Sequence, residues 1–224
     1  MNFYNTNSIE IYRLFCKTSD RIIKLVSAVM GNEFKELANT FNTKPGRGKL
    51  LVADPYLPDQ NFKRTVVLLT EYREDGAVGF IINRRTELTL DMVLPVNTHE
   101  DIPLYVGGPV QKETLHILHC DPNFGKEELK VAPGIYWGAD FDTLKSHIED
   151  GSLELDKFRF FLGYSGWGKD QLDQEVAAKS WIPTKFSKSF LCSENPDDLW
   201  GEVLESKGGN LKFLAKSPAD PILN

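Results

Sequence analysis

The sequence is poor in cysteine and has no long apolar run, and these two absences exclude several classes of protein. Its 224 residues include three cysteines, Cys16, Cys120 and Cys192, and no Cys-x-x-Cys pair. Few and widely spaced cysteines are typical of reduced thiols in a cytosolic protein rather than of a disulfide framework. No segment approaches the roughly 18 apolar residues of a membrane span, and the N-terminus lacks a signal-peptide pattern. We therefore expect a cytoplasmic protein without a membrane partner.

Acidic side chains outnumber basic ones outside the N-terminal region. Residues 1–48 hold seven of the 26 Lys and Arg residues but only four of the 32 Asp and Glu residues. The remaining chain is therefore strongly acidic, and the whole chain has a net charge of -6. An acidic domain lacks the basic surface expected of a nucleic-acid binder. We expect no direct DNA binding and predict a protein or small-molecule partner, while the composition leaves the oligomeric state open.

A turn cluster, Lys44-Pro-Gly-Arg-Gly48, predicts a boundary between two parts of the chain. The part before it is interpreted as a helical and polar extension, because residues 8–30 carry an apolar stripe at helical spacing. The first 29 residues are either a genuine extension or the product of a start codon assigned too early. The predicted parts are an extension at residues 1–45, a compact domain at 46–210 and a C-terminal tail at 211–224.

The compact part begins with β-branched and apolar runs, which later alternate with helical segments. Glu74-Asp75-Gly76 predicts a hairpin turn between two early strands, and Asp140 is a good N-cap for a helix that ends at Gly151. Strands that come first and helices that come later favour an α+β fold over a doubly wound parallel sheet. The predicted strands are residues 50–53, 65–70, 78–82, 104–106, 115–119, 134–137, 158–162 and 189–192. The predicted helices are residues 88–94, 140–149, 170–179 and 195–206.

The most informative motif is Gly163-Tyr-Ser-Gly-Trp-Gly-Lys-Asp-Gln-Leu172, which is predicted to be a glycine turn between a strand and a helix. The segment from Gly163 to Lys169 fits the phosphate-loop spacing, but Asp170 stands where that pattern has Ser or Thr. Ser165 also suggests a nucleophile elbow, although Trp167 replaces the last glycine of that motif and all four histidines precede the serine. The simplest alternative is a tight turn whose tryptophan packs into the core.

The sequence contains no convincing metal or cofactor motif. His116 and His119 lie on a predicted strand, where side chains three positions apart point to opposite faces. Gly107 and Gly108 lack the glycine spacing of a dinucleotide site. We therefore predict no catalytic residue, no metal and no cofactor.

Six blocks of sequence, taken together and in order, are far more specific than any single motif. Over roughly residues 46–205 the chain resembles the bacterial YqgE/AlgH family. The blocks that carry this resemblance are Gly48–Pro55, Phe62–Glu71, Gly76–Asn83, Gly107–Val110, Leu118–His119, and Gly163–Trp167 with Gln171–Leu172.

The resemblance implies a bifurcated, mostly antiparallel sheet that folds into a pseudo-barrel with flanking helices, in the bacterial cytoplasm. It implies no established reaction, although one branch of the family has been called a transcriptional regulator. The family has no recognised DNA-binding motif. The sequence departs from the family at Arg85, where Pro is frequent, and at Asp170, where Gly is frequent. Because Lys169 is not a family hallmark either, the phosphate-loop interpretation is weakened.

We therefore predict a non-enzymatic binding or regulatory module with a transcription-related role as one option. The alternative is a phosphate- or nucleotide-handling enzyme that uses the segment from Gly163 to Lys169. Turns that combine glycine with aromatic and amide side chains give a rigid, open surface for binding. The predicted surface consists of Asn83, Arg84, Gly107, Gly108, Tyr164, Trp167 and Gln171.

Overall fold

The computed structural model describes residues 43–191, 195–207, 211–212 and 215. The predicted N-terminal stripe and most of the predicted tail lie outside these residues. The strands are β1 (Lys49–Ala53), β2 (Val66–Arg73), β3 (Gly76–Ile81), β4 (Arg85–Thr89), β5 (Pro103–Val106), β6 (Val110–His119), β7 (Lys130–Ala132), β8 (Ile135–Trp137), β9 (Phe158–Gly168) and β10 (Trp181–Lys185). The helices are α4 (Leu90–Val93), α5 (Phe141–Glu149), α6 (Gln171–Ala177), α7 (Lys188–Leu191) and α8 (Leu199–Ser206), with short 3-10 turns η1 (Glu127–Leu129), η2 (Leu155–Lys157) and η3 (Pro196–Asp198).

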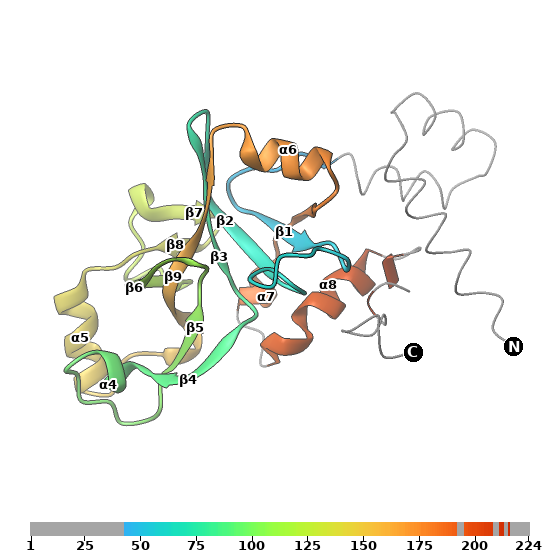
Figure 1. Cartoon of the computed structure of the whole chain (residues 1–224). Helices are drawn as coiled ribbons and strands as arrows, with labels where there is room; N and C mark the ends of the chain where they lie inside the picture. Colours follow the sequence, from blue (N-terminus) through green and yellow to red (C-terminus); the bar gives the residue numbers. More distant parts are fainter. Residues whose placement is uncertain (1–42, 192–194, 208–210, 213–214, 216–224) are drawn as a thin grey trace, which may run out of the picture.

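Strand β9 is the centre of the fold, because the sheet divides along it (Figure 1). Its second half pairs with β3, from Gly79–Ser165 to Gly76–Gly168, and continues into β2, β1 and β10. Its first half pairs with β6 on one side and with β5 in parallel. All other pairings are antiparallel. The bifurcated, mostly antiparallel sheet predicted from the family resemblance is therefore confirmed.

Strand β1 shows why helices cover both faces of one branch of the sheet. Side chains alternate along a strand, so Leu50 and Val52 face one side while Leu51 and Ala53 face the other. The first side is covered by α7 and α8, and Trp200 of α8 donates from Nε1 to the Ala53 carbonyl at 2.9 Å. The second side is covered by α6 (Figure 1). Both faces are apolar, which explains why these strands read as continuous hydrophobic runs.

The other branch has its own core beneath α4 and α5. Leu144 and Ile148 of α5 pack with Leu90 of α4 and with Phe158 and Phe160 of β9. The predicted N-cap is confirmed, because Asp140 accepts a hydrogen bond at its Oδ1 from the Thr143 amide at 2.9 Å. Figure 1 shows α4 and α5 at the same end of the molecule, far from α8.

Several predicted elements differ from the structure, and β4, β7 and β10 were not predicted. The predicted strand at 189–192 is wrong over its described residues, which belong to α7. The predicted helix at 88–94 is shorter, since β4 continues to Thr89. The predicted glycine turn after residue 162 is wrong, because β9 runs without interruption to Gly168. The hairpin at Gly76 and the helix at 140–149 are confirmed.

Candidate functional site

Asn83, the first residue of the predicted surface, forms hydrogen bonds that hold the loop before β2 in place. Its side chain is buried, with 7% of its surface exposed. Oδ1 accepts a hydrogen bond from the Val66 amide at 2.8 Å, and Nδ2 donates to the Arg64 carbonyl at 3.0 Å. Since one buried amide satisfies a donor and an acceptor of the same loop, the contacts of Asn83 fix the fold.

Arg84 forms hydrogen bonds to the same loop, nearer to the surface. Its guanidinium donates from Nη1 to the Asn61 carbonyl at 2.7 Å and from Nη2 to the Lys63 carbonyl at 3.3 Å. Partial burial lowers the pKa of this guanidinium from its usual value. The residue is half-buried, so part of it remains accessible to a partner.

Gly107 and Gly108 lie where the chain between β5 and β6 crosses β9. A Cβ atom on Gly107 would approach the Gly163 carbonyl oxygen to 2.2 Å, and one on Gly108 would approach the Tyr164 carbonyl carbon and oxygen to 2.2 Å. Such approaches are possible only for residues without a side chain. The ring of Tyr164 is half-buried beside the crossing, edge-on to His116 at 5.9 Å. The structure thus brings this crossing and Asn83-Arg84 together, since Gly107 O accepts from Ile81 N and Val106 N donates to Arg84 O.

Trp167 and Gln171 belong to a different face of the sheet, beneath and beside α6. Trp167 is 5% exposed, stacks on Phe62 and contacts Trp181 edge-on at 5.8 Å between ring centres. Its Nε1 donates to Glu175 Oε2 at 2.9 Å. Gln171 is exposed and joins this network, because its Nε2 donates to Glu175 Oε1 at 2.9 Å. The seven predicted residues therefore form two groups rather than one continuous surface.

The geometry at Gly163 to Lys169 differs from both catalytic motifs that the sequence suggested. A phosphate loop needs a turn whose amides converge, but residues 163–168 lie in β9 and pair with β6 and β3. Ser165 is fully buried and donates from Oγ to the Gly107 carbonyl at 3.0 Å, so it is not raised on an elbow. The turn comes later, at Asp170, where φ is +59°. The glycines serve close strand contacts instead.

The two histidines of β6 lie apart, as the strand period predicts. His119 is buried between the rings of Tyr136 and Phe158, both stacked on it, and Nε2 donates to the Gly138 carbonyl at 3.1 Å. Since a carbonyl only accepts, Nε2 carries the proton. Burial lowers the pKa of this imidazole, although the Gly138 carbonyl opposes that shift.

His116 is half-buried on the other side of β6. Its Nε2 lies 2.9 Å from Thr114 Oγ1, whose own proton is donated to the Gln111 carbonyl at 2.8 Å. The imidazole is therefore the donor to the hydroxyl. Burial lowers the pKa of His116 as well. Neither histidine has a carboxylate or cysteine arranged with it as a metal site, and no such cluster occurs among the described residues.

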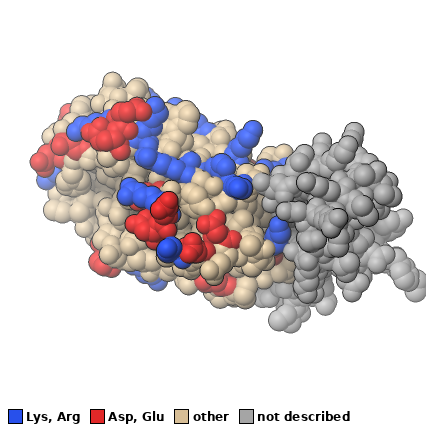
Figure 2. Space-filling view, turned by 90° about the horizontal axis from the view of Figure 1, so that it is seen from above, with Lys and Arg blue, Asp and Glu red and all other residues tan. Residues whose placement is uncertain are grey.

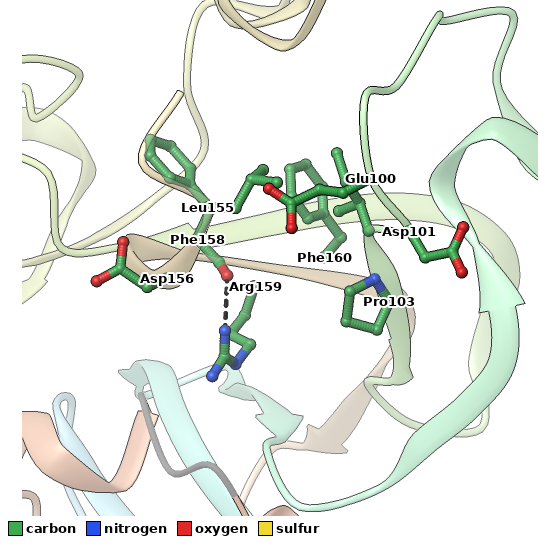
Figure 3. Close-up of a pocket in the computed structure, with 9 residues that line it drawn as sticks. Glu100, Asp101, Pro103, Leu155, Asp156, Phe158, Arg159 and Phe160 are labelled. Atoms are coloured by element: carbon green, nitrogen blue, oxygen red, sulfur yellow. Dashed lines mark hydrogen bonds between the residues drawn. The ribbon is translucent and has the colours of Figure 1, made fainter. Parts of the chain in front are cut away.

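Two features that sequence reasoning missed lie at the end of the molecule formed by α4, α5 and the start of β9. The first is a set of exposed large apolar side chains on β4, on α4 and at the first residue of α5: Leu88, Met92, Val93 and Phe141. The second is a cavity of about 190 Å³ between residues 100–103 and 155–160, drawn in Figure 3. The exposed group follows from the short helix at Leu90, whose amphipathic pattern the sequence could have revealed. The cavity joins two segments about 55 residues apart in the chain, and no local signal marks it.

Figure 2 shows acidic and basic side chains interleaved over the visible face of the molecule. Among the described residues, no helix has the length and apolar character needed to cross a bilayer.

Comparison with known structures agrees with the architecture. The solution structure of the AlgH protein from Pseudomonas aeruginosa superposes with a TM-score of 0.61 at 28% identity, covering 79% of this chain and 97% of that one. The crystal structure of protein DIP2367 from Corynebacterium diphtheriae superposes with a TM-score of 0.66 at 22% identity, covering 78% and 94% of the two chains. The second match supports the fold alone.

Sequence comparison identifies the family. A UPF0301 protein of Cytophaga hutchinsonii is 44% identical over 179 residues, which are 80% of this chain and 98% of that protein. A UPF0301 protein of Chlorobaculum tepidum is 38% identical over 195 residues, 87% of this chain and the whole of that protein. The profile described as AlgH-like matches residues 50–212, from the second residue of β1 to beyond α8. The chain therefore belongs to the AlgH-like family, as the order of its sequence blocks predicted.

Proposed function

We propose that the protein is a binding module that acts on a protein partner as an adaptor or regulator. Its contact surface is the apolar end, defined as Leu88, Met92, Val93 and Phe141. The carrying observation is the exposure of these side chains: 65% of Met92 and about two fifths of each of the others are open to solvent, at 41%, 40% and 42%. Leu88, Met92 and Val93 lie on one continuous segment of β4 and α4, and α4 shares a core with α5, whose first residue is Phe141. Exposed apolar side chains that gather on one surface mark interaction sites.

The apolar end is exposed although the structure beneath it is firmly packed. Leu90, between Leu88 and Met92 in the chain, is 1% exposed and belongs to the core that also holds Leu144 of α5. Helix α4 therefore has an anchored side and an open side. Because the exposed side chains contribute little to the core, changing them should cost little stability. Because they are open to solvent, they are also available for contact with a partner.

The accessible members of the surface predicted from sequence support the same kind of function. Arg84 and Tyr164 are half-buried, and Gln171 is exposed. We propose them as secondary contacts, since side-chain hydrogen bonds hold Arg84 and Gln171, and Tyr164 is paired with Val110 in the sheet. Binding of a partner to these side chains would therefore cause only a small loss of conformational entropy.

The test is capture of partners by the immobilised full chain and by a Met92→Ser/Val93→Ser variant. The matched control is Ala177→Ser/Ala178→Ser, which makes two serine changes at the exposed end of α6. Proteins from a lysate of the source bacterium are quantified by mass spectrometry, and the recovered partner is then titrated in purified form. We expect its dissociation constant to rise at least about tenfold for the α4 variant, a change of about 1.4 kcal/mol, and not for the control. Equal affinity for both variants would contradict the proposed surface.

A further inference from the structure

The part of the molecule that carries the apolar end also carries the net negative charge of the protein. We define the acidic region as residues 85–106, from the start of β4 to the end of β5, and residues 140–157, from the N-cap of α5 to the end of η2. It contains ten Asp and Glu residues but three Lys and Arg residues, a net charge of -7. Elsewhere the chain has 23 basic and 22 acidic residues, a net charge of +1. The charge of the protein is therefore concentrated around the apolar end.

The two ranges of the acidic region adjoin in space. Helices α4 and α5 contribute to the same core. His99 of the first range has its Nε2 atom 2.9 Å from the Glu149 carbonyl oxygen of the second. Both ranges also line the larger cavity, where Figure 3 shows Glu100 and Asp156 on different sides. The charges of the two ranges therefore act on one end of the molecule.

Most carboxylates of the acidic region are not neutralised by basic side chains. All ten are exposed. Within the described part of the chain, two of them form ion pairs, Glu149 with Lys145 at 3.8 Å and Glu154 with Lys157. The other eight form none there, so the surface keeps a negative potential that attracts cations.

The carboxylates flank the exposed apolar side chains. Three of them belong to residues that are next in sequence to a member of the apolar end: Glu87, Asp91 and Asp142. The surface thus has an apolar centre and a charged rim, the usual anatomy of a protein interface. A partner fits it best when its own apolar side chains are flanked by the opposite charge, because complementary potentials speed association and exclude wrong partners.

We propose that the apolar end binds a basic amphipathic segment of its protein partner, in which Lys and Arg flank a row of apolar side chains. The row contacts Met92, Val93 and Phe141, and the cations face the carboxylates of Glu87 and Asp142. This inference rests on the proposed function and specifies the chemistry of the partner. Segments of this kind place apolar anchors at helical spacing on one face.

The same charge disfavours other occupants of the apolar end. A nucleic acid or an anionic membrane presents phosphates, which the acidic region repels. A symmetric contact with a second copy would bring two regions of net charge -7 together. Like charges that face each other across an interface oppose association.

The probes that test this inference are two synthetic peptides of about 18 residues. One consists of Leu and Lys with the leucines at helical spacing, and the other has Glu at every Lys position. Fluorescence anisotropy measures their binding to the full chain. We expect the basic peptide to bind at least about tenfold more tightly than the acidic one. Its affinity should fall between about 50 mM and about 500 mM salt, because salt screens exposed charges. Equal binding of both peptides would overturn the proposal.

Two double variants locate the contact of the basic peptide. Met92→Ser/Val93→Ser removes apolar side chains, and Glu87→Gln/Asp142→Asn removes two charges. We expect each variant to weaken the binding of the basic peptide at least about threefold. All four side chains are exposed, so the fold, checked by circular dichroism, should be retained.

The matched control for the charge variant is Glu74→Gln/Asp75→Asn. It makes the same chemical changes at the exposed turn between β2 and β3, outside the acidic region. We expect the control to bind the basic peptide as the original chain does. A loss of affinity equal to that of the charge variant would show that the position of the charges does not matter and would overturn the proposal.

The variants also separate this inference from the proposed function. If only the serine variant weakens binding, the apolar end remains the contact surface and the basic chemistry of the partner is wrong. If neither variant differs from the control, or only the charge variant does, both proposals are wrong. Tighter binding by a peptide of residues 8–30 would make the chain's own N-terminal segment the occupant. Self-association of the full chain that the serine variant abolishes would make it a second copy. Either result would overturn the proposal.

Discussion

Ser165 Oγ donates a hydrogen bond to the main-chain carbonyl of Gly107 at 3.0 Å, across 58 positions of the sequence. Ser165 is fully buried, so the bond satisfies a hydroxyl that water cannot reach. The same carbonyl accepts the Ile81 amide at 2.9 Å. One oxygen thus joins the end of β3, the chain after β5 and the middle of β9. The motifs Gly107-Gly108 and Gly163–Trp167 are therefore two sides of one structural contact.

The closeness of this contact predicts that Gly108→Ala strongly destabilises the domain. The new Cβ would lie 2.2 Å from the Tyr164 carbonyl group and 2.4 Å from the Ser165 amide nitrogen, and backbone atoms cannot rotate away. Overpacking typically costs about 1–3 kcal/mol, and a clash with backbone atoms belongs at the upper end of that range. The free energy of unfolding, measured by urea denaturation, should fall by about 3 kcal/mol.

Gly201→Ala is the control for that experiment. Gly201 lies within α8, and the nearest atom to its added Cβ would be the Ala215 carbonyl oxygen at 4.0 Å. Alanine is favoured over glycine inside a helix by about 1 kcal/mol. We expect this variant to be as stable as the original chain or more so. A loss of stability at Gly201 equal to that at Gly108 would show that steric contact is not the cause.

Glu175 is predicted to be the main polar support of α6. Its Oε2 accepts from the Nε1 atoms of Trp167 and Trp181 at 2.9 and 2.7 Å. Glu175→Ala would leave two largely buried indole donors without partners, at a cost of about 1–3 kcal/mol each. We expect a lower free energy of unfolding and a changed tryptophan fluorescence. Gln174→Ala alters the exposed neighbour on the same helix and should do neither; equal effects would exclude the carboxylate as the support.

Elements set by local chemistry were predictable from the sequence. The hairpin at Gly76 follows from a turn between two β-branched runs, and Gly76 has the positive φ of 151° that glycine tolerates. Helix α5 follows from its cap at Asp140. Both signals lie within a few residues of the structure they specify.

Elements set by distant contacts were not predictable. The glycines after residue 162 indicate a turn if only their sequence neighbours are considered. A Cβ atom added at Gly163 would lie 2.6 Å from the Val110 carbonyl oxygen, so this position requires glycine because of a distant contact. Strand β10, which contains Pro183, was not predicted from the sequence. A proline is tolerated there because, among the described strands, β10 pairs with β1 alone and lies at the edge of the sheet.

The candidate sites show the same division. Asn83 and Trp167 were predicted to belong to a binding surface, yet the Val66 amide and Glu175 give them structural contacts that the sequence does not reveal. The cavity between residues 100–103 and 155–160 joins the chain before β5 to the chain at the start of β9. These two segments share no motif, so the sequence does not reveal the cavity.

Acidification below the ordinary pKa of histidine is predicted to destabilise the domain through His119. Burial lowers the pKa of this group in the folded state, so the unfolded chain binds the proton first as the pH falls. Stability is therefore fully present above about pH 6.5 and declines below it, by at most about 1.4 kcal/mol per pH unit for one such group. Urea unfolding between pH 8 and pH 5 measures the slope.

His116 contributes to the loss of stability at low pH in the same direction, because burial lowers its pKa as well.

His119→Phe keeps an aromatic ring between Tyr136 and Phe158 and removes one titrating group. Its unfolding free energy should depend less steeply on pH, although the lost bond to Gly138 lowers its value at every pH. The titration from pH 8 to pH 5 stays above the pH at which Asp140 and Asp150 ionise, because hydrogen bonds lower the pKa of both carboxyl groups. An unchanged slope in His119→Phe would contradict the prediction.

Ionisation of Tyr72 is predicted to occur at an unusually high pH. Its hydroxyl donates to Asp173 Oδ1 at 2.7 Å, which joins β2 to α6, and this bond raises the pKa of the phenol to about 12. Because the folded-state pKa lies above the unfolded value of about 10, the stabilisation is fully present below pH 10 and is lost as the pH rises toward 12.

Asp173→Ala removes both the acceptor and the charge, so the phenol should titrate near 10. Asp173→Asn keeps an acceptor without the charge and should give an intermediate value. Ultraviolet titration, with Tyr72→Phe to identify its share among seven tyrosines and circular dichroism to confirm folding, measures the shift. A Tyr72 midpoint that is the same in all three proteins would mean that Asp173 is not its cause.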